Sequence, residues 1–247
     1  MKKLSLIIPA NNEEGSIEKT VRAFNKVLRK EKIPHEILVV NDNSRDNTER
    51  ILKKLSKTIK ELRYINNKPP NGYGLAIRKG FNYFKGDYVA IVMADLSDNP
   101  QNLVKMFKKA LEGYDCVFGS RFIKGAVVRD YPLHKLILNR LANNLIKILF
   151  FIKYNDVTNA FKLYSKETIQ GLEPFLSNHF NLAVELPLKA IVRGYSYRIV
   201  PVDWTNRKKG ISKLKIKEMS SRYFFIILYC YLERLLSMGD YRKRIKN

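Results

Sequence analysis

The fold class is decided by the stretch LSLIIPANNEEGSIEKTVRAFNKVL, residues 4–28. It opens with LSLIIP (Leu4–Pro9), a short apolar run that is typical of a strand buried on both faces. From Ser16 onward the apolar residues recur at helical spacing, at Ile17, Val21, Phe24, Val27 and Leu28. The sequence therefore predicts a buried strand that leads into an amphipathic helix.

The same alternation continues along the chain. Further strands are expected at EILVVN (36–41), RYI (63–65), DYVAIVM (87–93) and DCVFG (115–119), and helices from about Asn47, around Leu75–Phe84 and from Pro100. Strands that alternate with helices favour an α/β fold, with a mostly parallel sheet covered on both faces. Ligands of such sheets bind beyond the carboxyl ends of the strands. The polar residues that follow each strand are therefore the candidates for function.

Beyond Arg121 the alternation becomes less regular. The elements expected there are an apolar and basic helix at about Leu133–Ile152, a turn at Asn155–Asn159, a strand AFKLY (160–164), a helix near Leu182–Val192 and a strand YRIVPVDW (197–204). No linker or compositional break divides the 247 residues. We therefore expect one catalytic domain over residues 1–214, followed by a basic and apolar C-terminal helix over residues 215–247.

The composition is strongly basic, with 46 Lys and Arg against 23 Asp and Glu, which gives a net charge of +23. Such an excess predicts attraction to nucleic acid, to an anionic membrane leaflet or to a phosphorylated substrate. A nucleic-acid-binding module would leave the acidic residues at the strand ends unexplained, because carboxylates repel backbone phosphates. We therefore expect no nucleic-acid partner. A dinucleotide-dependent oxidoreductase is also disfavoured, because no Gly-x-Gly-x-x-Gly follows the first strand.

Two features predict a cytoplasmic protein. Cys116 and Cys230 each lie in an apolar run without metal-ligating neighbours, so buried, reduced thiols are expected rather than a disulfide. The N-terminal residues before LSLIIP are too few for the apolar region of a signal peptide, and no small-residue cleavage site follows.

Charged residues follow several of the predicted strands. Asp42 follows the second strand, Asp95 and Asp98 follow the fourth, and Arg121 follows the fifth. Carboxylates beside a basic residue suit a metal-bound phosphate, because divalent metals take hard oxygen ligands and arginine binds phosphate oxygens. Asp42 and Asp46 could instead shape turns and cap the next helix. We prefer that interpretation for Asp46 and the functional one for Asp95.

Seven motifs, in this order and spacing, resemble the family 2 glycosyltransferases of GT-A fold, and within them the dolichyl-phosphate mannose synthase group. They are IPANNEE (8–14), VVNDNSRDNT (39–48), GYGLAIRKGF (72–81), VMADLSDNP (92–100), FGSRFIKGA (118–126), NDVTNAFKLYS (155–165) and WTNRKKGISKL (204–214). The resemblance runs from about Leu4 to Lys217. It implies transfer of a hexosyl group, with inversion, from a GDP- or UDP-linked sugar, and Mg²⁺ or Mn²⁺ as the cofactor.

The resemblance also implies roles for individual residues. The nucleotide-sugar pocket would be formed by Pro9, Asn11, Glu13, Asp42, Gly74, Ala94 and Asp95. The metal would be held by Asp95 together with Ser97, Asp98 or water, and phosphates would face Arg121 and the basic segment 207–213. Met93 departs from the family pattern, which usually has the first aspartate of Asp-x-Asp there, and Asn11 replaces a frequent aromatic residue. Magnesium can be held by one or two carboxylates plus substrate phosphates and water, so the loss at Met93 is tolerable.

A late helix indicates the acceptor. Family members that glycosylate a hydroxyl usually carry Glu-Asp at its start, whereas here Glu185 is followed by Leu186. A hydroxyl needs a general base, but a phosphate monoester is already anionic. The sequence therefore favours a polyprenyl (dolichyl-type) phosphate. The cations expected to offset the repulsion between the donor and acceptor phosphates are Arg121, Lys135, Arg207, Lys209 and Lys213. The residues expected to contact the acceptor phosphate are Lys135, Arg207, Ser212 and Lys213.

Alternatives remain for this region. Arg207, Lys213 and their neighbours could form an ordinary solvated basic loop. The enzyme could also glycosylate a sugar hydroxyl of a lipid-linked or polysaccharide acceptor, if another part of the chain supplies a carboxylate as base. The residues expected to be catalytic are Asp95, Arg121, Arg207 and Lys213.

The C-terminal run YFFIILYCYL (Tyr223–Leu232) is too short to cross a bilayer, which takes about 20 residues. Its basic flanks IKEMSSR and YRKRIKN predict a helix that lies on the cytoplasmic face of an anionic membrane or docks on a small membrane-protein partner. A buried core helix is the alternative.

Overall fold

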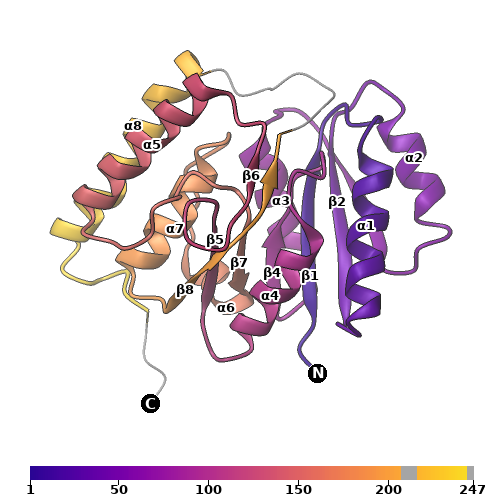
Figure 1. The fold of residues 1–247 in the computed structure, drawn as a ribbon, viewed down its shortest axis with the longest axis horizontal. Coiled ribbons are helices and arrows are strands. Elements are labelled where there is room, and N and C mark those ends of the chain that lie inside the picture. The colour runs from indigo at the N-terminus through magenta and orange to yellow at the C-terminus, as the bar shows by residue number, and fades with distance from the viewer. Residues whose placement is uncertain (207–215, 244–247) are drawn as a thin grey trace.

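The computed structural model describes residues 1–206 and 216–243. This part of the chain contains a seven-stranded sheet of order β3-β2-β1-β4-β7-β5-β8 (Figure 1). The strands are β1 (Leu4–Ala10), β2 (His35–Asp42), β3 (Leu62–Asn67), β4 (Tyr88–Ile91), β5 (Cys116–Ser120), β7 (Lys162–Ser165) and β8 (Tyr197–Pro201). Neighbouring strands run parallel except at β7, which is antiparallel to β4 and β5. The prediction of a mostly parallel α/β sheet is confirmed.

Helices cover both faces of the sheet. One face carries α1 (Ile17–Lys30), α2 (Thr48–Leu55) and α4 (Pro100–Ala110), and the other carries α3 (Tyr73–Tyr83), α6 (Lys166–Gly171) and α7 (Leu182–Val192). Successive side chains of a strand point to opposite faces. Leu6 and Ile8 of β1 are therefore buried on the first side and Ile7 on the second. Each fully buried side chain of this kind contributes about 1.5–3 kcal/mol.

Specific residues place two of these helices. Gly80 lets α3 approach β1, because a β-carbon on it would lie 2.7 Å from Cγ2 of Ile7. The start of α4 is set by Pro100, which needs no backbone N–H at the first helical position. The Asn99 side chain caps the same helix by accepting a hydrogen bond from the Gln101 N–H at 3.0 Å.

Two further helices, α5 (Leu133–Leu149) and α8 (Ile216–Leu236), lie side by side at one end of the sheet (Figure 1). α8 packs on α7, and its Ile226 and Cys230 are fully buried. Cys116 is buried as well, and both thiols are free, as expected. Within the described residues, no helix is long and apolar enough to cross a membrane.

Some boundaries differ from the sequence-based expectation. α5 ends at Leu149 rather than at residue 152, because Phe151 adopts a left-handed backbone with φ of 51°. The expected strand YRIVPVDW is two strands, β8 and β9 (Trp204–Thr205). β9 pairs with β6 (Val128–Arg129) in a separate two-stranded sheet. This break brings the chain back over the carboxyl ends of the main strands.

Candidate active site

A cavity of about 390 Å³ lies beyond the carboxyl ends of β4 and β5. Five residues expected from the sequence line it: Asp95, Ser97, Asp98, Arg121 and Lys135. They come from the loop after β4, the loop after β5 and the first turn of α5. The remaining wall includes Tyr131, Phe180, Trp204, Asn206 and Tyr223. The structure therefore joins the acidic strand end to the basic start of α5 in one cavity.

The loop after β4 holds its two carboxylates differently. Asp95 Oδ1 accepts a hydrogen bond from the Ser97 N–H at 3.1 Å, and Asp98 Oδ2 accepts one from the Met93 N–H at 3.0 Å. Leu96 between them has a φ of 55°, so the loop turns sharply and directs both carboxylates to the same cavity. Asp98 is only 3% exposed, and this burial raises its pKa to about 7.

A second buried charge lies behind the cavity. Lys162 of β7 is 1% exposed, and its ammonium donates hydrogen bonds to the carbonyl oxygens of Val157, Asn159 and Ala183. Burial lowers the pKa of Lys162 to about 7, although the Asp156 carboxylate acts in the opposite direction. Lys162 thus holds the 157–159 turn and α7 together at the cavity wall.

Arg121 lies at the cavity, but its charge is already paired. Its Nε and Nη2 donate to the two carboxylate oxygens of Asp156 at 2.9 and 2.8 Å, in the bidentate geometry that makes such pairs strong. The guanidinium also lies 5.5–5.6 Å from the ring centres of Tyr131 and Trp204. Asp156 is fully buried. Arg121 therefore stabilises the cavity wall. Lys135 also lines the cavity, and its ammonium is paired with no carboxylate of the described residues.

Asp42 lies apart from this cavity, at the end of β2. Its carboxylate accepts hydrogen bonds from the Asn67 amide at 2.8 Å and from the Gly72 N–H at 2.9 Å. Its backbone carbonyl accepts from the side chains of Asn11 at 2.6 Å and Asn71 at 2.9 Å. Asp42 and Asn11 therefore hold together the ends of β1, β2 and β3, and any contact with a nucleotide would be added to this role.

The other residues expected at the nucleotide also have packing roles. Glu13 accepts a hydrogen bond from the Ser16 hydroxyl at 2.9 Å, just before α1. The carbonyl of Ala94 accepts from the Thr20 hydroxyl at 2.7 Å and ties α1 to the end of β4. A β-carbon on Gly74 would lie 2.6 Å from the Ser177 carbonyl oxygen. Pro9 is half-buried in β1. None of these four lines the cavity described above.

Asp46 shapes a turn, as expected. One carboxylate oxygen accepts from the Thr48 N–H at 2.9 Å at the start of α2, and the other accepts from the Glu14 N–H at 3.0 Å. These hydrogen bonds lower the pKa of Asp46 despite the opposing effect of burial. The side chain therefore links the loops after β1 and β2.

The late helix offers no free base. Glu185 is fully buried, and its oxygens accept hydrogen bonds from the Leu176 and Ser177 N–H groups at 2.8 and 2.7 Å and from the Lys189 ammonium at 2.7 Å. Leu186 is fully buried too. Among the described residues that line the cavity, the carboxylates are those of Asp95 and Asp98.

The basic positions Arg207, Lys209, Ser212 and Lys213 lie outside the described residues. The chain reaches them from the cavity wall, since Asn206 lines the cavity. The Thr205 N–H donates to the Ser97 carbonyl at 3.3 Å, so β9 lies beside the acidic loop.

The donor set at the acidic loop fits a magnesium or manganese ion. Two carboxylates and a serine hydroxyl are hard oxygen ligands, and a cation would offset the cost of burying the Asp98 charge. The described residues contain no group of three or more His, Cys, Asp or Glu side chains that could hold a metal. Substrate phosphates and water would therefore have to complete the coordination.

Sequence reasoning missed Asp156 and Lys162 as parts of the site. Both lie in the quoted motif NDVTNAFKLYS, and a charged residue within such an apolar segment is a signal of a buried pair or of a lysine bound to carbonyl oxygens. Their partners could not be read from the sequence, because the Arg121–Asp156 contact joins residues 35 positions apart.

Solved structures share the fold. Glucosyl-3-phosphoglycerate synthase from Mycobacterium tuberculosis, in its complex with UDP, superposes with a TM-score of 0.69 at 17% identity, over 94% of this chain and 80% of that one. Its complex with phosphoglyceric acid gives a TM-score of 0.70 at 16% identity over the same shares. The sheet, its covering helices and this likeness define the GT-A fold.

The family follows from the sequence match. The family model described as glycosyl transferase family 2 matches residues 5–172, and the chain belongs to that family. Polyprenol monophosphomannose synthase of Mycolicibacterium smegmatis is 28% identical over 215 residues, which are 85% of this chain and 80% of that protein. Dolichol-phosphate mannosyltransferase of Pyrococcus furiosus is 27% identical over 220 residues, 87% of this chain. The chain spans 60% of the length of this second relative.

Proposed function

We propose that the protein transfers a mannosyl group from a nucleotide sugar to a polyprenyl phosphate, with inversion at the anomeric carbon. The observation that carries the proposal is the cavity at the end of β4, which Asp95, Asp98 and Lys135 line together and to which α7 supplies no base. The names of the two relatives support the same sugar and the same class of acceptor.

The state of Glu185 supports a phosphate acceptor. A hydroxyl acceptor must lose its proton during attack and needs a base within hydrogen-bond reach. The oxygens of Glu185 already bind two backbone N–H groups and the Lys189 ammonium. A phosphate oxygen is anionic without help, so it can attack the anomeric carbon directly, and the site then contributes positioning and charge neutralisation.

Lys135 is the described cation suited to the acceptor phosphate. It lies in the first turn of α5 and lines the same cavity as the acidic loop. Arg121 supports this arrangement from behind through Asp156 and the Tyr131 and Trp204 rings. We propose that Arg207, Ser212 and Lys213, which follow Asn206 in the chain, supply the remaining contacts to phosphate.

Asp95, with Ser97 and Asp98, would hold a magnesium or manganese ion at the donor diphosphate. Bound there, the ion would neutralise the charge that builds up on the departing nucleoside diphosphate. The glucosyl-3-phosphoglycerate synthase was crystallised with Mn²⁺ and UDP, which supports a divalent metal in this fold. Asp42, with Pro9, Asn11, Glu13, Gly74 and Ala94 around it, is proposed to form the nucleoside side of the donor site.

A lipid acceptor also implies a place of action. We propose that the protein works on the cytoplasmic face of a membrane as a peripheral protein, with residues 215–247 at the lipid surface or on a small membrane-protein partner. The exposed apolar side chains of α8 support this proposal, because the other side of the same helix is buried in the protein.

The test supplies radiolabelled GDP-mannose or UDP-glucose with one of three acceptors: a polyprenyl phosphate, the matching prenyl alcohol or phosphoglyceric acid. We expect label to enter the organic phase with GDP-mannose and the prenyl phosphate, and little transfer to the other two acceptors. Lys135→Ala should lower that turnover by about tenfold to a hundredfold, because a cation aligned with the transferring phosphates is lost.

Lys57→Ala is the matched control, since Lys57 is an exposed lysine that neither lines the cavity nor lies near α5 or α8 in the chain. Transfer to the alcohol or to phosphoglyceric acid without transfer to the prenyl phosphate would contradict the proposal. It would favour the alternative of a hydroxyl acceptor.

A further inference from the structure

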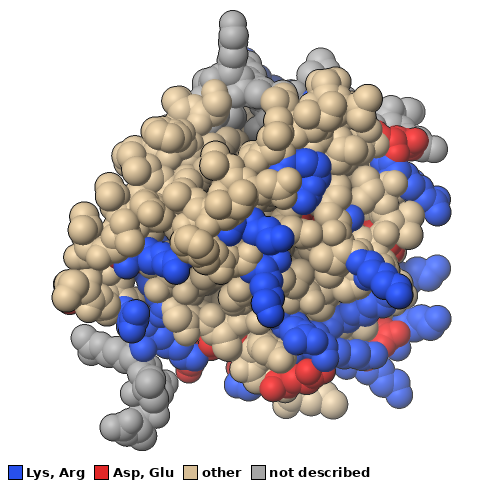
Figure 2. Space-filling view, turned by 60° about the vertical axis from the view of Figure 1, so that its left-hand side comes forward, with Lys and Arg blue, Asp and Glu red and all other residues tan. Residues whose placement is uncertain are grey.

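The outer surface of α5 and α8 is apolar. Leu141, Leu145 and Ile148 of α5 are 61–69% exposed, and Phe224, Phe225 and Leu232 of α8 are 44–67% exposed. We define the α5/α8 face by these six side chains. The two helices lie side by side (Figure 1), and Figure 2 shows this side of the molecule as a broad tan area with Lys and Arg along its lower margin. A continuous apolar surface of this kind marks a binding face.

The exposed charged side chains described on α5 and α8 themselves are basic. The sequence from Tyr131 to Asn155 contains no Asp or Glu, but it contains Lys135, Lys147 and Lys153. On the side chains described for α8, the acidic residue is Glu233, which is 7% exposed and paired with Arg193. The exposed charges on the described side chains of α5 and α8 are therefore positive, and the exposed carboxylates of Asp130 and Asp240 lie outside the two helices, before α5 and after α8.

We propose that the α5/α8 face docks on an anionic lipid bilayer, with both helices lying flat on the surface. Leucine and phenylalanine side chains would enter the boundary between headgroups and acyl chains, and Lys147 and its neighbours would reach the anionic headgroups. A second copy of the chain fits the face less well, because a symmetric contact would bring like charges together. α5 therefore takes part in docking as much as the C-terminal helix does.

The face leads to the catalytic cavity. Lys135 in the first turn of α5 and Tyr223 near the start of α8 both line that cavity, and Phe224 beside Tyr223 is 67% exposed. Docking would therefore bring the cavity close to the lipid surface. The benefit of this closeness rests on the proposed function, because it requires an acceptor phosphate held in the bilayer. The docking of the face on lipid does not depend on the proposed function.

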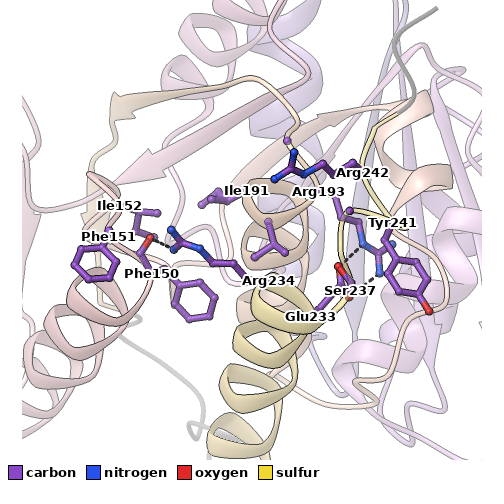
Figure 3. Close-up of a pocket in the computed structure, with 13 residues that line it drawn as sticks. Phe150, Phe151, Ile152, Ile191, Arg193, Glu233, Arg234, Ser237, Tyr241 and Arg242 are labelled. Atoms are coloured by element: carbon purple, nitrogen blue, oxygen red, sulfur yellow. Dashed lines mark hydrogen bonds and ion pairs between the residues drawn. The ribbon is translucent and has the colours of Figure 1, made fainter.

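The opposite end of the face carries a second basic feature. A cavity of about 360 Å³ lies at the C-terminal ends of α5 and α8 (Figure 3). Arg193 and Glu233 form its fixed wall, with hydrogen bonds of 2.8 and 3.0 Å between them. Arg234 donates to the Phe150 carbonyl oxygen, which joins α8 to the end of α5. Among the described residues, Arg234 and Arg242 have no carboxylate partner, so both remain available to lipid phosphates.

The test is sedimentation of the whole chain with vesicles of phosphatidylcholine, with and without phosphatidylserine, in the absence of prenyl phosphate and donor. We expect binding to the anionic vesicles. Leu145→Glu on α5 and Leu232→Glu on α8 should each weaken it about tenfold or more, because each places a charge in the apolar contact. Leu111→Glu, at a leucine that is 51% exposed at the end of α4, should leave binding unchanged.

Circular dichroism melting of each variant separates loss of fold from loss of docking. Equal binding of anionic vesicles by the parent and by Leu145→Glu would contradict the participation of α5 in docking. Absence of vesicle binding would overturn lipid docking altogether, and a dimer in light scattering that Leu145→Glu dissociates would identify a second copy as the occupant. Docking without any transfer to prenyl phosphate would refute the proposed function and leave this inference standing.

Discussion

At the scale of single residues, Asp95 and Asp98 line the same cavity but differ in burial and in hydrogen bonding. Asp98 is buried, accepts the Met93 N–H and has a pKa raised to about 7, whereas Asp95 is half-buried at the same loop. A carboxylate that must bind a cation near neutral pH works best when it is ionised there. We therefore propose Asp95 as the primary ligand, with Asp98 contributing once a cation offsets its burial.

Asp95→Ala should reduce metal-dependent turnover by about a hundredfold or more and leave the melting temperature nearly unchanged, since the loop keeps its Asp98 contact. Turnover is measured against added Mg²⁺ or Mn²⁺. Glu112→Ala, at an exposed carboxylate paired with Lys109, is the control. Near-normal turnover in Asp95→Ala, with no effect of EDTA on the parent, would contradict the assignment.

Asp42→Ala should weaken the binding of the preferred nucleotide by about 1–3 kcal/mol in calorimetric titration, because a buried polar group of the nucleotide would lose its hydrogen-bond partner. The same change removes the contacts to Asn67 and Gly72, so it should also lower stability. Asn67→Ala separates these effects, because it deletes one structural contact and keeps the carboxylate. Equal loss of nucleotide affinity in both variants would assign Asp42 to loop geometry alone.

Lys162 should give the stability of the metal-free protein a distinct pH dependence. The unfolded lysine keeps its proton up to about pH 10.5, whereas burial lowers the pKa of folded Lys162 to about 7. Between these values the unfolded state binds more protons, so the free energy of unfolding rises with pH, by at most about 1.4 kcal/mol per unit. Urea unfolding of Lys162→Met at pH 7.5 and 9 should show a smaller rise than the parent. An identical rise in the two proteins would mean that folded Lys162 keeps its proton.

The sequence located the residues of the acidic loop but not their partners. Asp95 and Asp98 were predictable because they directly follow a buried strand whose carboxyl end must lie at the ligand edge. The pairing of Arg121 with Asp156 was not, because it depends on the turn 155–159 folding back over β5. For Glu185 the sequence indicated only that no aspartate follows it, and the structure adds that its own carboxylate is fully engaged.

At the scale of elements, α8 has two different sides. Ile226 and Cys230 are buried against the α7 side of the protein, and Phe224 and Leu232 face outward. From the sequence, α8 could be either a buried core helix or a surface helix. The first description fits its buried side and the second fits its exposed side. The order of strands and helices was predictable from their periodicity. The separation of β8 from β9 was not, because it depends on long-range pairing with β6.

The contact of α8 with the domain depends on Glu233. Arg193 is 2% exposed, and Glu233→Ala would leave its guanidinium buried without a countercharge. We expect the free energy of unfolding to fall by about 3–5 kcal/mol in Glu233→Ala and by clearly less in the double variant Arg193→Met with Glu233→Met. Chemical denaturation measures both. Equal losses would show that the pair acts only through packing.

At the scale of the whole molecule, the net charge of +23 and the apolar α5/α8 face both favour binding to an anionic bilayer. Long-range attraction brings a cationic protein to an anionic surface and is screened by salt, whereas apolar insertion is not. The two contributions should therefore respond differently to ionic strength. Nucleic acid remains a poor alternative partner, because the cavity edge carries Asp95 and Asp98.

Raising the salt concentration should depress turnover more strongly on prenyl phosphate in anionic vesicles than on a short, water-soluble prenyl phosphate. The Debye length falls from about 10 Å at 0.1 M to about 3 Å at 1 M, so attraction to the vesicle is lost, while contacts inside the cavity are screened less. Initial rates are compared for the two acceptors across this range, with Leu145→Glu as the variant that lacks full apolar contact. We expect that variant to be the more salt-sensitive on vesicles and to match the parent on the short acceptor. Parallel salt curves for both acceptors would mean that salt acts at the catalytic cavity itself and that attraction to the bilayer does not limit turnover.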